Sequence, residues 1–171
     1  MSYVEHEQQA HAAARVVRCG IITISDTRTE ATDTSGALIC EALVGGGHEI
    51  VRRVLVKDEP TQIVALVRAL AEAGCQVIIT NGGTGIASRD STFEAIDALL
   101  EKRLPGFGEL FRMLSYQEIG PAAMLSRATA GTWGSTLIVC LPGSTNAVQL
   151  GMHKLILPEL SHLVWEIFRQ Q

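Results

Sequence analysis

The stretch QVIITNGGTGIASRDSTFE, from Gln76 to Glu94, decides the fold of this chain. Its run Val77–Ile79 is short, apolar and β-branched, which is typical of a strand buried on both faces of a sheet. From Thr92 the apolar residues recur with helical spacing, which predicts a helix as far as Lys102. The stretch therefore predicts a buried strand, a polar loop and a helix N-terminus in succession.

The loop between that strand and that helix carries Gly82, Gly83 and Gly85 among polar residues. Glycines let backbone N–H groups approach a ligand closely, and a helix N-terminus adds partial positive charge. Arg89 and Asp90 add a cation and a carboxylate that could hold a metal. We interpret the loop as an anion site, most often for phosphate; the alternative is a plain surface connection in which glycines only turn the chain.

Two better-known phosphate-binding templates do not fit this loop. No Gly-Lys-Ser or Gly-Lys-Thr follows the glycines, so it is not a Walker A loop. The glycine spacing also differs from the G-x-G-x-x-G dinucleotide fingerprint.

The composition indicates one well-filled α/β core. The chain has 171 residues, of which 47% are hydrophobic and only 5% aromatic, which favours helices layered on a parallel sheet. The net charge of −4 and the lack of a basic run argue against nucleic acid as a partner. The four cysteines lack zinc spacing, so we expect small buried hydrophobes in a reducing compartment: Cys19, Cys40, Cys75 and Cys140.

Residues 1–14 are polar and alanine-rich, which predicts a flexible N-terminal tail before a single domain spanning residues 15–171. The N-terminus lacks a signal-peptide pattern, and no apolar run approaches the length of a membrane span. The sequence therefore predicts a cytoplasmic protein with no membrane partner.

Buried-strand patterns alternate with helical ones along the chain, at residues 16–24, 50–56, 77–79 and 136–141 for the strands. This order predicts a three-layer α/β/α fold with a mostly parallel central sheet and a short antiparallel or edge extension. Asp33 or Thr34 is predicted to cap one helix, and Asp58 to cap the helix that opens with Pro60. Pro158 is predicted to kink or split the last helix.

Four polar loops follow the carboxyl ends of the predicted strands, where ligands bind in such sheets. They are Ser25–Thr27, Lys57–Pro60, Asn81–Asp90 and Pro142–Asn146. Three of these loops offer an aspartate: Asp26, Asp58 and Asp90. A single aspartate is more often a helix cap than a catalyst, but three on one sheet edge favour a functional site.

With these loops in place, the chain closely resembles the MoaB/MogA family of molybdenum cofactor biosynthesis, which includes the G domain of gephyrin, and it is closest to MoaB. The resemblance covers nearly everything after residue 15. The matching stretches are GIITISDTR (Gly20–Arg28), DTSG (Asp33–Gly36), KDEP (Lys57–Pro60), NGGTGIASRDSTFEA (Asn81–Ala95), PGFGE (Pro105–Glu109), SYQEIGPAAMLSRATAG (Ser115–Gly131) and LPGSTNAV (Leu141–Val148).

By that resemblance the chain binds molybdopterin and adenylylates it with Mg²⁺ and ATP, giving adenylyl-molybdopterin and pyrophosphate. The resemblance implies that Asp58 and Asp90 are catalytic and hold the Mg²⁺. Arg89 would pair with a phosphate or form a structural salt bridge. The implied substrate- and nucleotide-binding residues are Ser25, Asp26, Thr27, Asn81, Gly82, Gly83, Thr84, Gly85, Arg89, Pro142, Gly143, Ser144 and Asn146.

This sequence departs from the family pattern at three loop positions. Ser91 and Phe93 stand where the family usually has Val and Pro, and Thr145 stands where it usually has Pro. None of these changes removes a charged group, so they concern the geometry of the loops more than their chemistry.

Two other functions remain open from the sequence. One is a pterin-binding or assembly protein of the same family that does not catalyse adenylyl transfer. The other is an unrelated phosphate or nucleotide binder of flavodoxin-like topology. The resemblance also implies a homotrimer or hexamer and contacts with other molybdenum cofactor biosynthesis proteins. We take the apolar C-terminal helix and the N-terminal tail as candidates for the interface.

Overall fold

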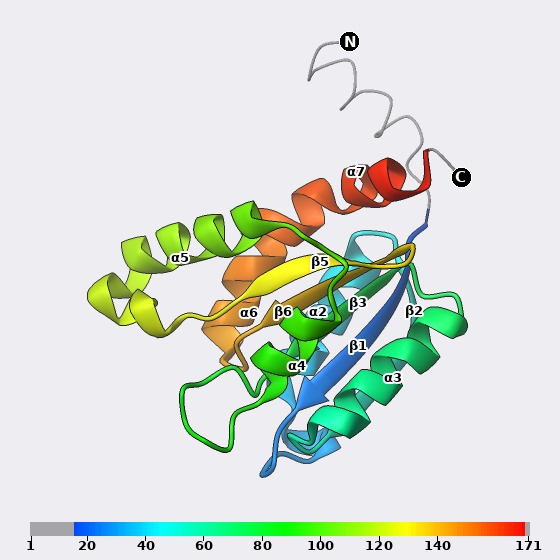
Figure 1. Ribbon diagram of the computed structural model, residues 1–171. Helices are drawn as coiled ribbons and strands as arrows, with labels where there is room; N and C mark the ends of the chain where they lie inside the picture. Colours follow the sequence, from blue (N-terminus) through cyan, green and yellow to red (C-terminus); the bar gives the residue numbers. More distant parts are fainter. Residues whose placement is uncertain (1–15, 170–171) are drawn as a thin grey trace.

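The chain is built on a six-stranded sheet with strand order β2-β1-β3-β6-β5-β4, as seen in a computed structural model that describes residues 16–169 (Figure 1). The strands are β1 (Arg18–Ile24), β2 (Glu49–Val56), β3 (Val77–Asn81), β4 (Lys102–Arg103), β5 (Thr129–Trp133) and β6 (Thr136–Leu141). Strands β2, β1, β3 and β6 pair in parallel, whereas β5 and β4 form an antiparallel extension at one edge. The predicted sheet is confirmed.

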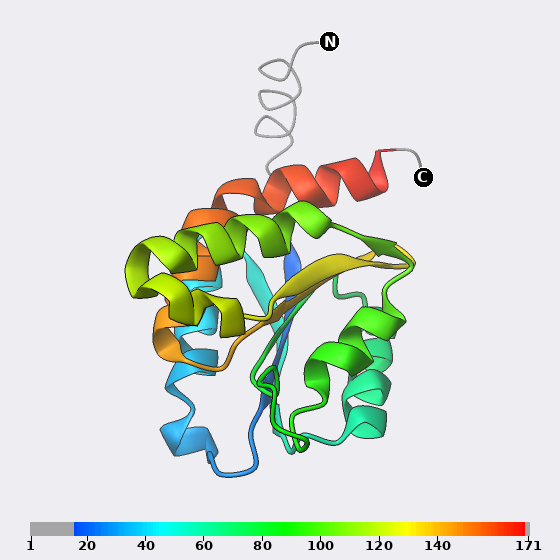
Figure 2. The same cartoon turned by 60° about the vertical axis from the view of Figure 1, so that its left-hand side comes forward.

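Helices cover both faces of this sheet, so the fold has the three predicted layers (Figure 2). The α-helices are α2 (Thr34–Gly45), α3 (Pro60–Glu72), α4 (Thr92–Leu99), α5 (Pro105–Ile119), α6 (Thr145–Gly151) and α7 (Leu157–Phe168). Three short turns complete the chain: η1 (Glu30–Thr32), η2 (Gly120–Leu125) and η3 (Met152–Ile156).

The core divides into two layers because successive strand residues point to opposite faces of the sheet. On one side Ile79 of β3 packs with residues of α2, α5, α6 and α7, including the fully buried Phe111. On the other side Ile78 packs with α3 and α4, including Ile63 and Ile96. The β-branched run at 77–79 is therefore buried on both faces, as its composition predicts.

Two of the predicted helix starts are confirmed and one is wrong. Asp33 caps α2, since its Oδ1 accepts a hydrogen bond from the Gly36 N–H at 2.9 Å. Pro60 opens α3 as predicted, but Asp58 does not cap it; the N-cap is Glu59, whose side chain makes no capping bond. The Asp58 carboxylate is used elsewhere, as the site described below shows.

The helix predicted to reach Lys102 ends at Leu99 instead. Leu100 is extended, and the Glu101 N–H donates to the Thr132 carbonyl at 2.8 Å. The next two residues form β4, because pairing with the edge of β5 satisfies their backbone groups.

The C-terminal helical stretch is split, as Pro158 predicts, but the break lies just before the proline. A π-helical turn, η3, joins α6 to α7, and Pro158 lies in the first turn of α7. A proline is tolerated in a first turn because its missing N–H is not needed there. The apolar residues Ile156, Leu160 and Val164 face the chain's own core.

All four cysteines are free thiols; Cys19, Cys75 and Cys140 are buried as predicted, whereas Cys40 is only partly buried. Burial raises the pKa of the Cys19 and Cys140 thiols to about 12, so neither is a thiolate at neutral pH. None of the helices described between residues 16 and 169 has the length and apolar character needed to cross a membrane. The predicted tail, residues 1–14, lies outside the described residues.

Candidate functional site

The four predicted loops meet at one edge of the sheet because β1, β2, β3 and β6 are parallel. This edge lies at the bottom of Figure 1, where the arrowhead of β1 ends. The loops enclose an open cleft of about 550 Å³. Its lining residues are Ile24, Ser25, Asp26, Thr27, Arg28, Asp58, Gly82, Gly83, Thr84, Gly85, Arg89, Asp90, Leu125, Pro142 and Gly143.

Three of the residues expected at the site do not line this cleft. Asn81 ends β3 and is fully buried; its Nδ2 donates to Thr23 Oγ1 at 3.0 Å. Ser144 caps α6 by accepting a hydrogen bond from the Ala147 N–H. Asn146 lines a separate hollow beside His153. The other twelve predicted residues are brought together.

The cleft also contains three residues that the sequence interpretation missed: Ile24, Arg28 and Leu125. Arg28 ends the polar run after β1, so its charge and its place next to Thr27 could have identified it as a site residue. Leu125 is an exposed apolar residue of η2, and nothing in its local sequence distinguishes it from a surface leucine.

The glycine loop, residues 82–90, has its conformation fixed by close backbone contacts. Gly82 and Gly83 have φ angles of +100° and +63°, a region that other residues rarely adopt. A Cβ atom at Gly82 would overlap the Ile24 carbonyl oxygen, and one at Gly83 would overlap both the Thr92 hydroxyl and the Asp58 carboxylate. Glycine is therefore required at both positions for two independent reasons.

Asp58 lies beneath the glycine loop and joins it to the end of β2. Its side chain is only 5% exposed. Oδ1 accepts hydrogen bonds from Ser91 Oγ at 2.9 Å and Thr92 Oγ1 at 3.1 Å. Oδ2 accepts one from the Ser91 N–H at 3.2 Å. This carboxylate thus stands at the N-terminus of α4, where the helix dipole favours a negative charge.

Asp90, at the end of the glycine loop, is half-buried and keeps its carboxylate available. Among the hydrogen bonds of residues 16–169, none involves the Asp90 side chain. Its Oδ2 would lie 2.5 Å from a Cβ atom at Gly85, so the missing side chain at Gly85 leaves room for this carboxylate. Of the two predicted catalytic aspartates, Asp90 is the one whose side chain makes no hydrogen bond among the described residues, whereas Asp58 accepts three.

Arg89 bridges two carboxylates from neighbouring loops. Its Nε donates to Asp26 Oδ2 at 3.0 Å, and its Nη2 donates to Glu59 Oε1 at 3.0 Å. The Arg89 hydrogen bond, and a further one from the Asp58 N–H, lower the pKa of Asp26 below its ordinary value. Arg89 therefore forms a salt bridge in this structure, and a phosphate in the cleft would have to compete with these two carboxylates.

Arg127 holds the other side of the glycine loop. Its Nε donates to the Thr84 carbonyl at 2.9 Å, and its two Nη atoms donate to the Glu94 carboxylate at 2.6 and 3.0 Å. The guanidinium lies over the Phe93 ring, 4.5 Å from its centroid. Hydrogen bonding to Arg127 lowers the pKa of Glu94. Phe93 thus supplies an aromatic contact at the position of one departure from the family pattern.

The last loop of the site is tied to the N-terminus of α2. The Gly143 carbonyl accepts hydrogen bonds from Arg28 Nη2 at 3.0 Å and Ser35 Oγ at 2.8 Å. Thr145 is another residue that departs from the family pattern, and its Oγ1 lies 3.3 Å from Oγ1 of Thr34. These contacts bring Gly143 against the backbone of Gly82, where a Cβ on Gly143 would lie 3.0 Å from the Gly82 Cα.

The side chains of the cleft suit a cation whose coordination shell is completed by atoms of a bound substrate. Within residues 16–169, no group of three or more His, Cys, Asp and Glu side chains could hold a metal ion by itself. Mg²⁺ is commonly bound by one or two carboxylates together with substrate phosphates and waters. Asp90 and the unused acceptor site of Asp58 could supply the two carboxylates of such a site. They are too few to coordinate Mg²⁺ without a substrate.

Comparisons with known proteins agree with this architecture. A family described as "Probable molybdopterin binding domain" matches residues 20–162. The molybdenum cofactor biosynthesis protein B of Bacillus cereus is 51% identical, with 99% of this chain and 100% of that protein covered.

Solved structures give the same result. The crystal structure of a molybdenum cofactor biosynthesis protein B is 52% identical with a TM-score of 0.87, covering 91% of this chain and 98% of the other. The tungsten cofactor synthesizing protein MoaB from Pyrococcus furiosus is 37% identical with a TM-score of 0.81, covering 90% and 98% of the two chains.

Proposed function

Since the chain belongs to the molybdenum cofactor biosynthesis protein B family, we propose that it binds molybdopterin and adenylylates it in the cleft described above. The family membership supports a role in molybdenum cofactor biosynthesis. The transfer of an adenylyl group is the finer part of the proposal, and it rests on the chemistry that the cleft can carry out.

The proposed reaction is a displacement at phosphorus. An oxygen of the terminal phosphate of molybdopterin attacks the α-phosphorus of ATP and forms a new P–O bond. The bond from the α-phosphorus to the bridging α–β oxygen breaks, and pyrophosphate leaves with the electron pair. The nucleophile is already ionised at neutral pH, so the protein has to align two anions and offset their charge but does not need a base.

The residues of the cleft suit those two tasks. The backbone of the glycine loop can offer N–H donors to phosphate oxygens, whereas the N–H groups of Ser91 and Thr92 at the start of α4 already donate to Asp58 and to the Gly83 carbonyl. Arg28 and Arg89 also line this cleft, and Arg89 would have to exchange its salt bridges with Asp26 and Glu59 for a phosphate. Leu125, whose side chain is exposed, supplies apolar surface to the cleft, which suits the face of a pterin ring.

Mg²⁺ would be held by Asp90 and Asp58 together with phosphate oxygens of ATP. When bound there, the ion would offset negative charge on the phosphates. Asp90 has no competing hydrogen bond among the described residues, so we assign it the larger share of this binding.

One observation carries the proposal: a glycine loop before a helix N-terminus and two aspartates meet in a single cleft at the carboxyl edge of the sheet. The test is pyrophosphate release by the purified protein. We expect release only when molybdopterin, ATP and Mg²⁺ are all present. Pterin binding without release would instead support the alternative, a non-catalytic molybdopterin-binding protein of the same family.

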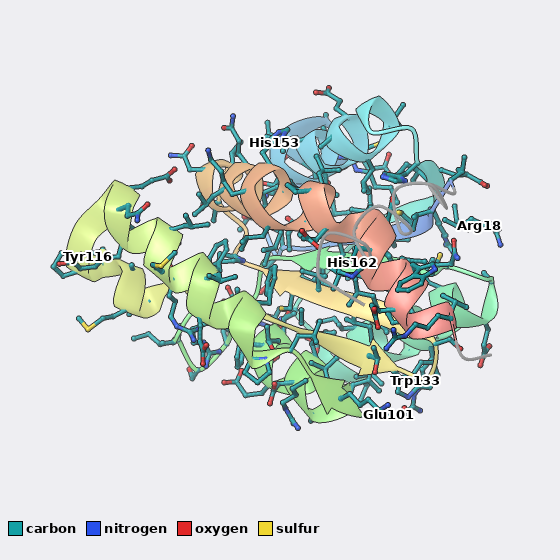
Figure 3. The ribbon with its side chains drawn as sticks, turned by 90° about the horizontal axis from the view of Figure 1, so that it is seen from above. Arg18, Glu101, Tyr116, Trp133, His153 and His162 are labelled. Carbon is teal, nitrogen blue, oxygen red and sulfur yellow. The ribbon has the colours of Figure 1, made fainter. Side chains whose placement is uncertain are left out.

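We also propose that the protein is a homo-oligomer that associates through the face formed by α5 and η2. Large apolar side chains are exposed along this face: Leu110, Met113, Tyr116, Ile119, Met124 and Leu125. Figure 3 shows Tyr116 at the outer end of α5, pointing away from the sheet. Exposed apolar surface of this extent on one face is typical of a protein–protein interface.

A further inference from the structure

Ser91 donates to both oxygens of one carboxylate. Its hydroxyl donates to Asp58 Oδ1 at 2.9 Å, and its backbone N–H donates to Oδ2 at 3.2 Å. Two donors from one residue restrict rotation of the carboxylate about its bond to Cβ, because a turn of the group would break both bonds at once. Asp58 lies 33 positions before Ser91 in the sequence, so this pairing joins two separate loops.

The Ser91 hydroxyl does not cap the helix that it precedes. Ser91 is the N-cap residue of α4, and a serine in that position commonly accepts a hydrogen bond from an N–H of its own helix. Here its side chain makes no capping bond and donates to Asp58 instead. Ser91 therefore uses its hydroxyl to orient the Asp58 carboxylate and not to cap α4.

The two carboxylate oxygens of Asp58 accept different numbers of hydrogen bonds. Each carboxylate oxygen has about two acceptor sites. Oδ1 accepts two hydroxyl donors, from Ser91 and Thr92, and is saturated. Oδ2 accepts only the Ser91 N–H and lies against Gly83, a residue that lines the cleft. One acceptor site therefore remains on the oxygen that is next to the glycine loop.

We propose that Ser91 is a positioning residue, which holds the Asp58 carboxylate so that Oδ2 serves the magnesium–nucleotide substrate. This inference rests on the proposed function, and it assigns a role to a residue that touches neither the substrate nor the cation. Thr92 alone would leave the group with a single hydroxyl donor on Oδ1. The Ser91 hydroxyl fills the second acceptor site of Oδ1, which leaves Oδ2 as the oxygen with an unused acceptor site.

The test measures nucleotide binding and does not need turnover. The probe is α,β-methylene-ATP, whose α–β bridge cannot be cleaved, titrated calorimetrically with Mg²⁺ and again with EDTA. Ser91→Ala removes the hydroxyl and keeps the N–H. Ser91→Gly does the same while keeping a residue that is favoured at an N-cap. Ser91→Thr restores a hydroxyl, and Ser88→Ala is the matched control, an exposed serine of the same loop.

We expect wild type to bind the probe more tightly with Mg²⁺ than with EDTA. Ser91→Ala and Ser91→Gly should lose about tenfold in affinity with Mg²⁺, the effect of one hydrogen bond to a charged group, and should match wild type in EDTA. Ser91→Thr should recover most of the loss, and Ser88→Ala should behave as wild type.

Three results would overturn the inference. Equal affinity of Ser91→Ala and wild type in Mg²⁺ would show that the hydroxyl has no positioning role, while the proposed function would stand. An equal loss with Mg²⁺ and with EDTA would show that Ser91 only maintains the loop. A wild-type protein whose affinity does not respond to Mg²⁺ would overturn both this inference and the proposed metal site.

Discussion

Removing the Arg127 side chain should loosen the glycine loop by a measurable amount. Arg127→Ala deletes the hydrogen bond to the Thr84 carbonyl, the paired bonds to Glu94 and the contact with the Phe93 ring. Only the first of these acts on the glycine loop directly. The other two fix the guanidinium against the first turn of α4.

The three contacts differ in strength because they differ in exposure. A charged donor on a carbonyl is worth about 1.5–3 kcal/mol, and the Arg127 side chain is 25% exposed. The Glu94 side chain is 60% exposed, so that ion pair contributes only about 0.5 kcal/mol. The contact with Phe93 adds about 0.5–1 kcal/mol. Because such terms are not additive, we expect Arg127→Ala to lower the free energy of unfolding by about 2–3 kcal/mol.

Urea denaturation followed by tryptophan fluorescence measures this loss, at several protein concentrations so that any association is taken into account. Glu94→Gln should cost only about 0.5 kcal/mol, since it removes the exposed pair alone. Arg68→Ala is a matched control, because Arg68 also lies over an aromatic ring, 5.7 Å from the centroid of Trp133, but away from the glycine loop.

The reasoning would be refuted by either of two results. If Glu94→Gln destabilised the protein as much as Arg127→Ala, the exposed ion pair would be the main contact. If Arg127→Ala were no less stable than Arg68→Ala, the bond to the Thr84 carbonyl would contribute nothing.

Three further predictions follow from single contacts. Gly83→Ala should lower the free energy of unfolding by about 1–3 kcal/mol, because φ is +63° and the new methyl group has no room; wild-type stability in urea would contradict this. Burial raises the pKa of Asp33, but hydrogen bonds from Arg53, Gly36 and Thr23 lower it more, and the net pKa lies below the ordinary 3.8. Stability from the Asp33 carboxylate is thus complete above that value and is lost as pH falls through the lower folded pKa. Arg53→Met should therefore be less stable than wild type near about pH 7, with a difference that shrinks toward about pH 2; a constant difference across that range would be inconsistent with the ion pair. Met113→Lys should lower the mass measured by light scattering, because it places a charge on the exposed face of α5; an unchanged mass would place the interface elsewhere.

The fold could be predicted from the sequence because its signals are local or periodic. The β-branched run at 77–79 indicates a strand buried on both faces, and the cap at Asp33 indicates where α2 begins. Once the strands are taken as parallel, the loops after them must share one edge, and this follows from topology without any coordinates.

The rest of the site could not be predicted because its partners are far apart in the sequence. Asp58 looks like a local helix cap, yet its donors lie 33 and 34 positions later. Arg127 reaches the Thr84 carbonyl across 43 positions. No periodic pattern in the sequence predicts contacts between residues so far apart. The contacts of Asp58 and Arg127 are therefore seen only in the folded structure.

The departures at Ser91 and Phe93 show the same limit. From the sequence they are departures from the family pattern that concern the geometry of the loop. In the structure each makes a contact of its own, Ser91 with Asp58 and Phe93 with Arg127. Their effect on loop geometry depends on those distant partners and could not be judged from the loop alone.

The most direct test of the central claim is pyrophosphate release by wild type and by Asp90→Asn, measured side by side with molybdopterin, ATP and Mg²⁺. Asp90→Asn keeps the size of the side chain and removes its charge, so we expect turnover to be abolished while the fold and molybdopterin binding are retained. A wild-type rate in Asp90→Asn would contradict the assignment of the metal to this carboxylate. No release by the wild type, with molybdopterin still bound, would contradict adenylyl transfer itself.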